Sequence, residues 1–486
     1  MAVKALLVHP PDEMEAMLGV GREFVQKYEP LGLLYIAAVA RAAGHEVAVV
    51  DAHAEGLSPD AVEARVLRDR PDVVGLSVLT CSGAIAYDLG RRIKAALPET
   101  LVVFGNVHAS VYARQYLERG CCDVVVHGEG ERPFLGLLEH RDGRRALEEV
   151  PAIAFRTREG RIAATRPAAY LEEDLSSLPM PARDLVSRNG YSLDTISNQL
   201  YVGKSRSSSK TMSTSRGCWY RCTFCVVNQK PRFASPAAVV DEMQHLEREL
   251  GAEYVFIIDP LCMYDQARMF AICEEIGRRG LRLKWGCDAR VSCVTPDLIR
   301  AMDRANCYDL SFGIESGVQR LLNAVKKGTT LGQVARAIET VCRYTDIRVG
   351  GLFILGLPGE SAEDSLETIR FAKSLPLDMA QFSLCTPYPG SALFEELRAA
   401  GRLDDGIRPD GTLDTSVWRR YSAYISFTSL DPIWVTPEKT PGQLRALQKR
   451  AQREFYLRPS QILRHLGRIR PSNVLRVLRV AKAGFF

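Results

Sequence analysis

The chain has 486 residues, a length that suggests two to four domains rather than one. Hydrophobic residues make up 46% and charged residues 25%, with 37 Gly and 25 Pro, which excludes a disordered, collagen-like or coiled-coil protein. The net charge of +5 gives no reason to expect a nucleic-acid partner. No apolar run reaches the roughly 18 residues of a membrane span, and the N-terminus resembles a buried strand, so we expect a cytoplasmic protein.

Short apolar runs alternate with amphipathic stretches over residues 1–145. The expected strands are 3–8, 46–50, 73–78, 101–104 and 123–126, with helices at 31–43 and 83–96. This order predicts an α/β, Rossmann-like domain with a parallel sheet covered on both faces. Ligands of such sheets lie beyond the carboxyl ends of the strands, so the loops there are expected to line one crevice. No G-x-G-x-x-G follows the first strand, so a dinucleotide is not expected.

A second series of alternating elements begins after a linker at residues 146–205, which contains a strand candidate at 152–155. Part of this connector, which includes a Ser- and Lys-rich stretch at residues 204–210, is expected to be mobile. The second series has expected strands at 211–215, 254–259, 283–288, 309–314, 348–355 and 380–384, and helices at 236–249, 266–277, 331–344 and 362–374. Six β/α units predict a partial (β/α)6 barrel over residues 206–400, followed by a helical C-terminal region at 401–486.

Three of the 13 cysteines stand apart from the rest. The odd count and irregular spacing do not fit a secreted disulfide framework. Cys218, Cys222 and Cys225 lie within eight residues after the first barrel strand, a spacing that lets three thiols converge on one soft metal centre. A structural zinc site needs a fourth ligand, and the next Cys or His is His245 in an expected helix. Three thiolates on a cubane cluster would leave one iron open.

This C-x3-C-x2-C loop, with aromatic Phe224 before the last cysteine, resembles the radical S-adenosylmethionine (radical SAM) superfamily. The resemblance implies a [4Fe–4S] cluster on the three cysteines. Its open iron would bind the amino and carboxylate groups of SAM, and its electron would cleave SAM to methionine and a 5′-deoxyadenosyl radical. A zinc site or a redox thiol is the alternative. The other ten cysteines are expected to be buried thiols rather than a second cluster, with Cys262 nearest the substrate.

The resemblance extends to SAM-binding residues in the barrel. Asp259 would receive the SAM amino group or cap a helix, and Arg290 would pair with the SAM carboxylate or form a surface ion pair. Glu315 and Ser316 would contact the ribose or serve in packing. Leu355 lies in the segment 351–360 that would receive adenine, and Pro387 in the closing loop 387–390; plain strand-to-helix turns are the alternative there.

The N-terminal domain resembles the cobalamin-binding domain that precedes the barrel in one branch of that superfamily. The resemblance rests on residues 28–33, 77–80, 105–108 and 128–131, with Asn106 where relatives commonly have a second glycine. The residues expected to bind cobalamin are Ser77, Leu79, Thr80, Gly105, Asn106, His108, Gly128 and Glu129. A flavodoxin-like domain without cobalamin is the alternative.

A D-x-H-x-x-G pattern at residues 51–56 matches the motif that places a histidine on cobalt in other cobalamin proteins. Here it follows the second strand rather than the first. We therefore predict base-off cobalamin with no histidine below the metal, and Leu79 or Thr80 nearest the lower face.

Together the resemblances imply a cobalamin-dependent radical SAM enzyme, a methyltransferase acting on an unactivated carbon or on phosphorus. The alternatives are an enzyme of the same branch without methyl transfer, as in cyclisation, ring contraction or hydration, and a non-catalytic cobalamin sensor. The implied partners are a small-molecule substrate, such as a tetrapyrrole, a lipid or a secondary metabolite, and an external flavodoxin- or ferredoxin-type electron donor. No general acid or base can be assigned from the sequence.

The C-terminal tail carries most of the basic excess. From Arg445 onward there are 11 Lys or Arg residues and one acid, Glu454. Apolar residues recur at helical intervals after Phe455. This amphipathic pattern predicts either docking on the barrel with a solvated basic face, or contact with a membrane surface or an anionic substrate.

Overall fold

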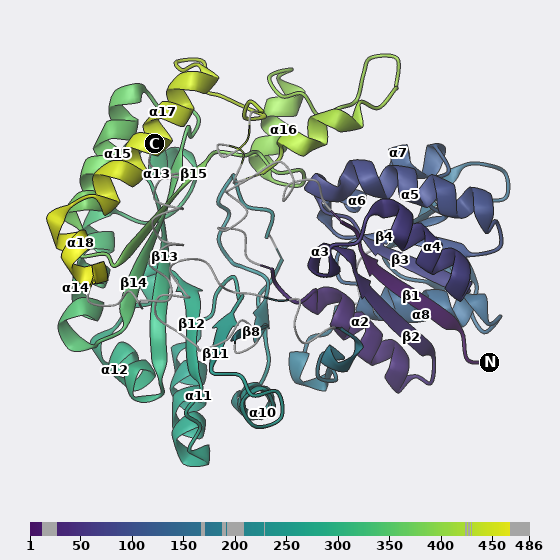
Figure 1. The fold of residues 1–486 in the computed structure, drawn as a ribbon, viewed down its shortest axis with the longest axis horizontal. Helices are drawn as coiled ribbons and strands as arrows, with labels where there is room; N and C mark the ends of the chain where they lie inside the picture. The colour runs from purple at the N-terminus through teal and green to yellow at the C-terminus, as the bar shows by residue number, and fades with distance from the viewer. Residues whose placement is uncertain are drawn as a thin grey trace.

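The computed structural model describes residues 1–11, 27–166, 171–186, 191, 209–227, 229–422, 425, 428 and 430–466. Two sheets lie side by side in this part of the chain, each covered by helices (Figure 1). The N-terminal sheet and the barrel sheet correspond to the two predicted α/β series. The expected fold class, a Rossmann-like domain followed by a partial barrel, is confirmed.

The first sheet has the order β2-β1-β3-β4-β5-β6-β7, in which β1 to β5 are parallel and the last two strands antiparallel. Its strands are β1 (Lys4–His9), β2 (Glu46–Asp51), β3 (Val73–Ser77), β4 (Leu101–Gly105), β5 (Val124–Val126), β6 (Ile153–Arg156) and β7 (Ile162–Ala164). Its helices are α2 (Leu31–Ala42), α3 (Ala52–Glu55), α4 (Pro59–Asp69), α5 (Gly83–Ala96), α6 (Val107–Val111), α7 (Ala113–Glu118) and α8 (Glu131–Arg141). The apolar strands β1, β3 and β4 are buried on both faces, as a parallel sheet between helices requires. Strands β6 and β7 extend this sheet into the predicted linker.

The second sheet has the order β8-β11-β12-β13-β14-β15, with every neighbouring pair parallel. Its strands are β8 (Ser209–Met212), β11 (Tyr254–Ile257), β12 (Lys284–Ala289), β13 (Cys307–Glu315), β14 (Arg348–Leu355) and β15 (Met379–Leu384). Its helices are α10 (Pro236–Arg248), α11 (Gln266–Arg279), α12 (Pro296–Arg304), α13 (Gln319–Ala324), α14 (Leu331–Tyr344) and α15 (Ala362–Ser374). Because strands are added in chain order, the six predicted β/α units form one curved, open sheet.

A small antiparallel hairpin follows β8 and was not predicted. Strand β9 (Ser215–Arg216) pairs with β10 (Arg232–Phe233), so the chain between them forms one loop. The expected strand at 211–215 is therefore two strands, β8 and β9, separated by a bend. Lys210, the last residue of the Ser- and Lys-rich stretch, is buried in β8, and its Nζ lies 2.9 Å from Oε1 of Glu29. Residues 201–208 lie outside the described residues.

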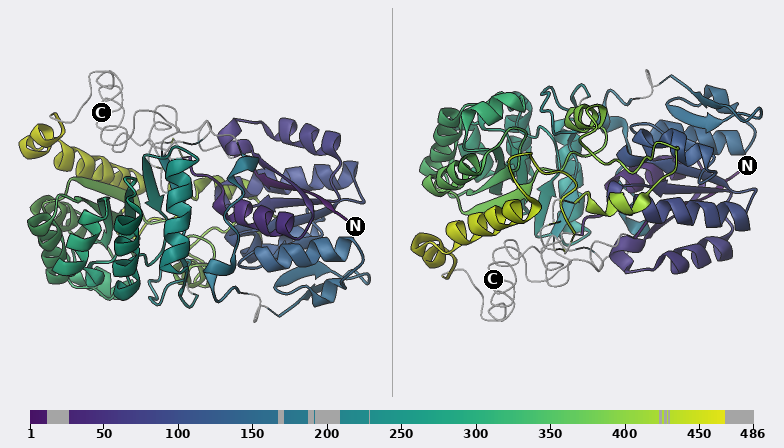
Figure 2. Two further views of the ribbon diagram at one scale, coloured as in Figure 1. Left: turned by 90° about the horizontal axis from the view of Figure 1, so that it is seen from below. Right: turned by 90° about the horizontal axis from the view of Figure 1, so that it is seen from above.

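The C-terminal region packs on both domains. It contains α16 (Ala392–Ala399), a short 3-10 helix (Thr415–Arg420), α17 (Pro441–Tyr456) and α18 (Pro459–Leu466). Trp418 belongs to the core of the N-terminal domain, whereas Phe455 belongs to the core of the barrel. Figure 2 shows α17 lying along the barrel, and Gln461 donates a 2.6 Å hydrogen bond to the Leu377 carbonyl. The tail up to Gln461 thus docks on the barrel; residues 467–486 lie outside the described residues.

Among the described helices, none combines the length and the apolarity that crossing a bilayer requires.

Candidate active site

A cavity of about 1090 Å³ lies between the N-terminal sheet, the hairpin of the barrel and the C-terminal region. Its wall includes the loops at the carboxyl ends of β1, β3, β4 and β5, which is where an open α/β sheet holds its ligands. All eight residues expected to bind cobalamin line this cavity: Ser77, Leu79, Thr80, Gly105, Asn106, His108, Gly128 and Glu129. The structure therefore brings them together, and their contact with cobalamin stays a prediction.

Asn106 stands where relatives commonly have glycine, and its backbone explains why. Its φ is +81° and its ψ is 172°, a backbone conformation that glycine adopts freely and that other residues adopt only under strain. The side chain accepts a 2.7 Å hydrogen bond from the Val107 amide and donates a 3.1 Å bond to the Ser77 hydroxyl. Asn106 therefore keeps the glycine-like turn and ties together the loops after β3 and β4.

Leu79 and His108 differ in how they face the cavity. Leu79 is 40% exposed, an apolar side chain presented to the open space. His108 is 1% exposed, and neither ring nitrogen has a hydrogen-bond partner in the described part of the chain. Its ring packs at 4.5 Å centroid distances on Tyr112 and on Trp418. Burial lowers the pKa of His108 to about 3, so the imidazole is neutral at neutral pH.

Glu129 links the cavity to the hairpin that carries the cysteine loop. Its carboxylate accepts a 2.8 Å hydrogen bond from Arg216 of β9 and also pairs with Arg232 of β10. Arg216 additionally bonds Glu131 at 2.7 Å and lies over the Tyr35 ring. Both strands of the hairpin are thus bonded to the loop after β5.

The cysteine loop spans the chain between β9 and β10, and a glycine sets its entry. Gly217 has φ +86°, and a Cβ there would lie 2.5 Å from the Lys230 carbonyl oxygen. The amide of Cys218 donates a 2.8 Å bond to the Gln229 carbonyl, and the amide of Cys225 donates a 3.1 Å bond to the Cys222 carbonyl. These bonds hold the loop in a closed shape with all three thiols partly exposed.

The donor set of this loop fits an iron–sulfur cluster. Burial raises the pKa of Cys225, and the neighbouring Cys222 and Cys218 thiols raise it further. In the described part of the chain, no three Cys, His, Asp or Glu side chains are grouped tightly enough for one metal ion. Thiols that are farther apart than the ligands of a single ion are compatible with a cubane cluster, in which each thiolate binds a different iron. A fourth protein ligand is also lacking for zinc within this described loop.

Asp259 holds the segment that leads into the hairpin. The residue is 3% exposed, and its carboxylate accepts a 2.6 Å bond from the Thr214 amide and a 2.5 Å bond from the Thr214 hydroxyl. Burial raises its pKa despite these bonds. The helix-cap alternative is wrong, because α11 begins at Gln266 and its cap is Asp265. Contact of Asp259 with the SAM amino group stays a prediction.

Arg290 packs directly on the cysteine loop. Its guanidinium carbon lies 3.4 Å from the centre of the Tyr220 ring, and Nη2 donates to the Lys327 carbonyl. The residue is 8% exposed, so the surface ion-pair alternative is wrong. The Nε of Arg290 is buried with no hydrogen-bond partner among the described residues. An unpaired N–H in this position fits the expected contact with a carboxylate.

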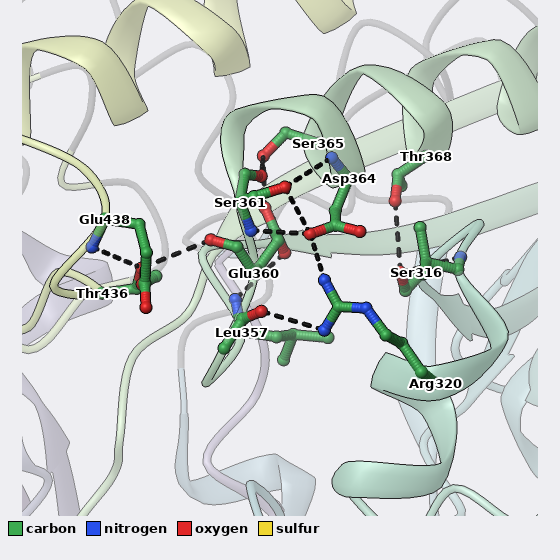
Figure 3. Close-up of polar contacts among 12 residues, drawn as sticks. Ser316, Arg320, Leu357, Glu360, Ser361, Asp364, Ser365, Thr368, Thr436 and Glu438 are labelled. Carbon is green, nitrogen blue, oxygen red and sulfur yellow. Dashed lines mark hydrogen bonds and ion pairs between the residues drawn. The ribbon is translucent and has the colours of Figure 1, made fainter.

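Glu315 and Ser316 have different surroundings although they are adjacent. Glu315 pairs with Lys327 at 2.6 Å, both are buried, and the backbone of Glu315 is left-handed at φ +68°. Such strain persists where the surrounding structure imposes it, often at functional sites. Ser316 is fully buried and lies 3.2 Å from the hydroxyl of Thr368 in α15 (Figure 3). That contact favours the packing alternative for Ser316.

The segment after β14 is held by Glu360 and the C-terminal region. Glu360 is fully buried and accepts bonds from the Gly356 amide at 2.9 Å and the Leu357 amide at 3.1 Å. Thr436 donates to its backbone carbonyl at 3.3 Å (Figure 3), and Lys439 pairs with its carboxylate at 2.9 Å. The segment 351–360, which is expected to receive adenine, is therefore held in place by contacts with the C-terminal region. Leu355 itself is a fully buried core residue.

The outcomes for the closing loop, for Phe224 and for the other cysteines are as follows. In the loop 387–390, Pro387 is buried and does not line the cavity, whereas Pro389 and Gly390 do. Phe224 packs at the edge of the N-terminal core. Cys262 is 1% exposed and belongs to the core of the barrel together with Cys287. Its expected position nearest the substrate stays a prediction. Of the ten other cysteines, all are buried except Cys81 and Cys342.

The barrel interior holds two carboxyl groups that sequence reasoning missed. Trp285 and Cys287 of β12 face the outer core, so Asp288 faces the inside. Desolvation of its carboxyl group, followed by the charges of Asp309 and Glu315, raises the pKa of Asp288 to about 7. Burial raises the pKa of Asp309 to about 6, and Tyr254 donates to it at 2.8 Å. Strand alternation was the signal that could have found Asp288.

Comparisons with known proteins match both parts of the chain. Residues 17–138 match the B12 binding domain, and residues 212–372 match the Radical SAM superfamily. An uncharacterized methyltransferase of Pyrococcus horikoshii is 30% identical over 469 residues, which cover 96% of this chain and 95% of the relative.

Two further relatives differ in the activity that they are named for. An anaerobic magnesium-protoporphyrin IX monomethyl ester cyclase of Rubrivivax gelatinosus is 28% identical, with 81% of this chain and 70% of the relative covered. The cytidylyl-2-hydroxyethylphosphonate methyltransferase of Streptomyces wedmorensis is 30% identical, with 77% and 79% covered.

Among solved structures, the fold is similar to that of the radical S-adenosylmethionine methyltransferase TsrM from Kitasatospora setae with cobalamin and a [4Fe–4S] cluster bound. The TM-score is 0.68 at 18% identity, and the match covers 97% of this chain and 90% of TsrM. The likeness extends through both sheets and the C-terminal region.

Proposed function

Because the chain belongs to the family of cobalamin-dependent radical SAM enzymes, we propose that it is a methyltransferase that acts on an unactivated carbon or phosphorus atom of a small molecule. The observation that carries this proposal is the shared cavity. Ser77 and Leu79 line it from the N-terminal domain, and Ser213, Arg216 and Val226 line it from the hairpin and the cysteine loop. A group seated there would face the cysteine loop directly.

The residues around the cavity fit the two cofactors. Cys218, Cys222 and Cys225 would hold the cluster, and the loops after β3, β4 and β5 would hold cobalamin. When bound, the cluster supplies the electron that cleaves SAM, and cobalamin supplies the methyl group. The unpartnered nitrogens of His108 and the exposed Leu79 offer polar and apolar contacts to a large cofactor.

The chain's own residues position the reactants and exclude water. Arg290 has a buried N–H free among the described residues, and it would pair with the SAM carboxylate while stacked on Tyr220. Glu129 would hold the hairpin, and hence the cluster, at a set distance from the cobalamin loops. The C-terminal residues Tyr421 and Ser422 close one wall of the cavity against water.

The test is an anaerobic turnover with SAM, a reductant and candidate substrates. Methyl transfer predicts a product heavier by one methyl group and the release of S-adenosylhomocysteine together with 5′-deoxyadenosine. The cyclase named among the relatives favours the second candidate, cobalamin-dependent chemistry without methyl transfer, and it keeps tetrapyrroles among the substrates to be tried. Deoxyadenosine without S-adenosylhomocysteine would support that candidate and contradict methyl transfer.

An external electron donor would approach the exposed side of the cysteine loop. Trp219 is 53% exposed there, and its neighbour Arg221 is exposed and basic. An acidic flavodoxin or ferredoxin fits a basic, aromatic contact of this kind. Changing Arg221 to Glu is expected to slow SAM cleavage with reduced flavodoxin and to leave cleavage with dithionite unchanged. Equal rates for variant and wild type with flavodoxin would contradict this docking site.

We propose that the protein is cytoplasmic and that it touches the membrane surface. In α18, Ile462 is 41% exposed and Leu463 is 72% exposed, beside the basic residues of the tail. Such a face suits an anionic bilayer surface. Co-sedimentation with vesicles that contain anionic lipid is expected to fall when Leu463 is changed to Glu. Co-sedimentation equal to that of the wild type would contradict the proposal.

A further inference from the structure

A histidine and a carboxylate from adjacent strand ends form a polar centre on the wall of the cavity. His9 ends β1 and Asp51 ends β2, and the two residues are paired in register across the sheet. Nδ1 of His9 lies 2.9 Å from Oδ1 of Asp51. His9 lines the cavity and its side chain is 18% exposed, whereas that of Asp51 is 1% exposed. The sheet itself therefore sets His9 in front of a buried carboxylate.

Further contacts keep Asp51 charged and in place. Tyr191 donates a 2.9 Å hydrogen bond to Oδ2, and the Ala54 amide donates a 3.1 Å bond to Oδ1. Burial alone would raise the pKa of Asp51, but the bond with His9 and these other contacts bring it below the ordinary value. A charged carboxylate can only accept, so the proton of neutral His9 lies on Nδ1 and points at Asp51.

This orientation leaves the second ring nitrogen as a lone-pair acceptor. No described residue bonds Nε2 of His9. A carboxylate behind an imidazole fixes its tautomer and the orientation of its ring, an arrangement that proteins use to aim histidine at a bound group. On the two sides of His9 in the sheet lie His53, in the helix α3 that follows β2, and Ser77, the last residue of β3, and both also line the cavity.

Resting on the proposed function, we propose that Nε2 of His9 accepts a hydrogen bond from bound cobalamin. The donor would be an N–H of a corrin amide side chain. Asp51 is the positioning residue. This role agrees with the expectation that no histidine binds cobalt directly, since the lone pair is used on a proton.

The test measures hydroxocobalamin binding to the full-length chain by visible titration. His9→Phe removes the acceptor and is expected to weaken binding about tenfold, the effect of one buried hydrogen bond. Asp51→Asn can donate to Nδ1 and so turn Nε2 into a donor, and it is expected to weaken binding to a similar extent. His245→Phe, on the far helix α10, is the control and is expected to bind as the wild type does.

The outcomes separate this inference from the proposed function. A wild-type chain that binds no cobalamin contradicts both, whereas wild-type affinity in His9→Phe contradicts only the inference. Histidine labelled with 15N tests direct coordination: an unchanged EPR spectrum of the cob(II)alamin form supports the hydrogen bond, and altered nitrogen splitting overturns it. If His9→Phe does not fold, His9→Ala replaces it, because alanine also lacks a side-chain acceptor; wild-type affinity together with an unshifted visible spectrum of the bound cofactor would then count against the proposal.

Discussion

Arg216 Nη1 lies 2.8 Å from Glu129 Oε2, so the strand that leads into the cysteine loop is bonded to the loop that follows β5 in the other domain. The same carboxylate pairs with Arg232 on the second strand of the hairpin. Reactions that use two cofactors depend on the distance between them. This carboxylate with its two arginines connects the loop after β5, which is expected to bind cobalamin, directly to the hairpin that carries the cysteine loop.

Glu129→Gln is expected to destabilise the protein by about 3 kcal/mol, because it leaves two largely buried guanidinium groups with one countercharge fewer. Urea unfolding monitored by circular dichroism measures the change. Glu395→Gln, in the exposed pair with Arg398, is the matched control and is expected to cost less than about 1 kcal/mol. Similar losses in the free energy of unfolding for the two variants would show that the Glu129 contacts stabilise the protein no more than an exposed ion pair does.

Gly217→Ala is expected to lower the iron content of the reconstituted protein. Alanine at φ +86° is strained, and its Cβ would lie 2.5 Å from a backbone oxygen of Lys230, so the entry to the cysteine loop must shift. Iron analysis after anaerobic reconstitution measures the effect. Gly277→Ala in α11 meets no atom within 4 Å and is expected to bind iron normally. An iron content equal to that of the wild type in both variants would contradict the claim that cluster binding needs glycine at position 217.

His108 is expected to make the N-terminal domain less stable in acid. Its pKa is about 3 in the folded protein, below the ordinary value of 6.5, so between these values the unfolded chain binds a proton that the folded chain does not. Stability is therefore full above about pH 6.5 and is lost as the pH falls toward 3, by at most about 1.4 kcal/mol per pH unit. Unfolding at pH 7 and pH 5 checks this. His108→Phe is expected to show a smaller difference, and an unchanged difference would refute the assignment.

Asp288 is expected to make the protein less stable as the pH rises, the opposite of the pH dependence that His108 gives. Its folded pKa of about 7 lies above the ordinary value of 3.8, so the folded chain holds the proton more tightly and loses stability as the pH rises from about 4 to about 7. Asp288→Asn removes this loss and is expected to be more stable than the wild type at pH 8, by more than at pH 5. Asp297→Asn, an exposed aspartate of α12, is expected to show no such trend. A constant difference for Asp288→Asn would contradict the raised pKa.

Much of the fold could be predicted because the apolar periodicity is strong. The helices α14 and α15 have the predicted bounds, and all six barrel strands were placed to within a few residues. The hairpin β9 and β10 could not be predicted, because two-residue strands leave no periodic pattern. Nor could β6 and β7 be assigned to the first sheet, since pairing partners are not encoded in a strand's own period.

The parts of the candidate site that could be predicted are those whose residues lie close together in the sequence. The cysteine loop and the strand-end loops are local motifs, so Cys218 and Ser77 could be proposed as site residues from the sequence alone. The partners of Glu129, Asp259 and Arg290 lie 87, 45 and 37 residues away, and only the folded chain brings them together. For the same reason His9, which needs Asp51 42 residues away, escaped notice.

The central claim is that one chain holds a [4Fe–4S] cluster on its cysteine loop and cobalamin across the cavity. Metal analysis of the anaerobically reconstituted protein tests it most directly, with Cys222→Ser as the loop variant and Cys342→Ser, an exposed cysteine far from the loop, as the control. The account predicts the iron of a full cluster and equimolar cobalt in the wild type and the control, and a large loss of iron with cobalt retained in Cys222→Ser. A wild-type protein without cobalt, or iron that persists in Cys222→Ser, would contradict it.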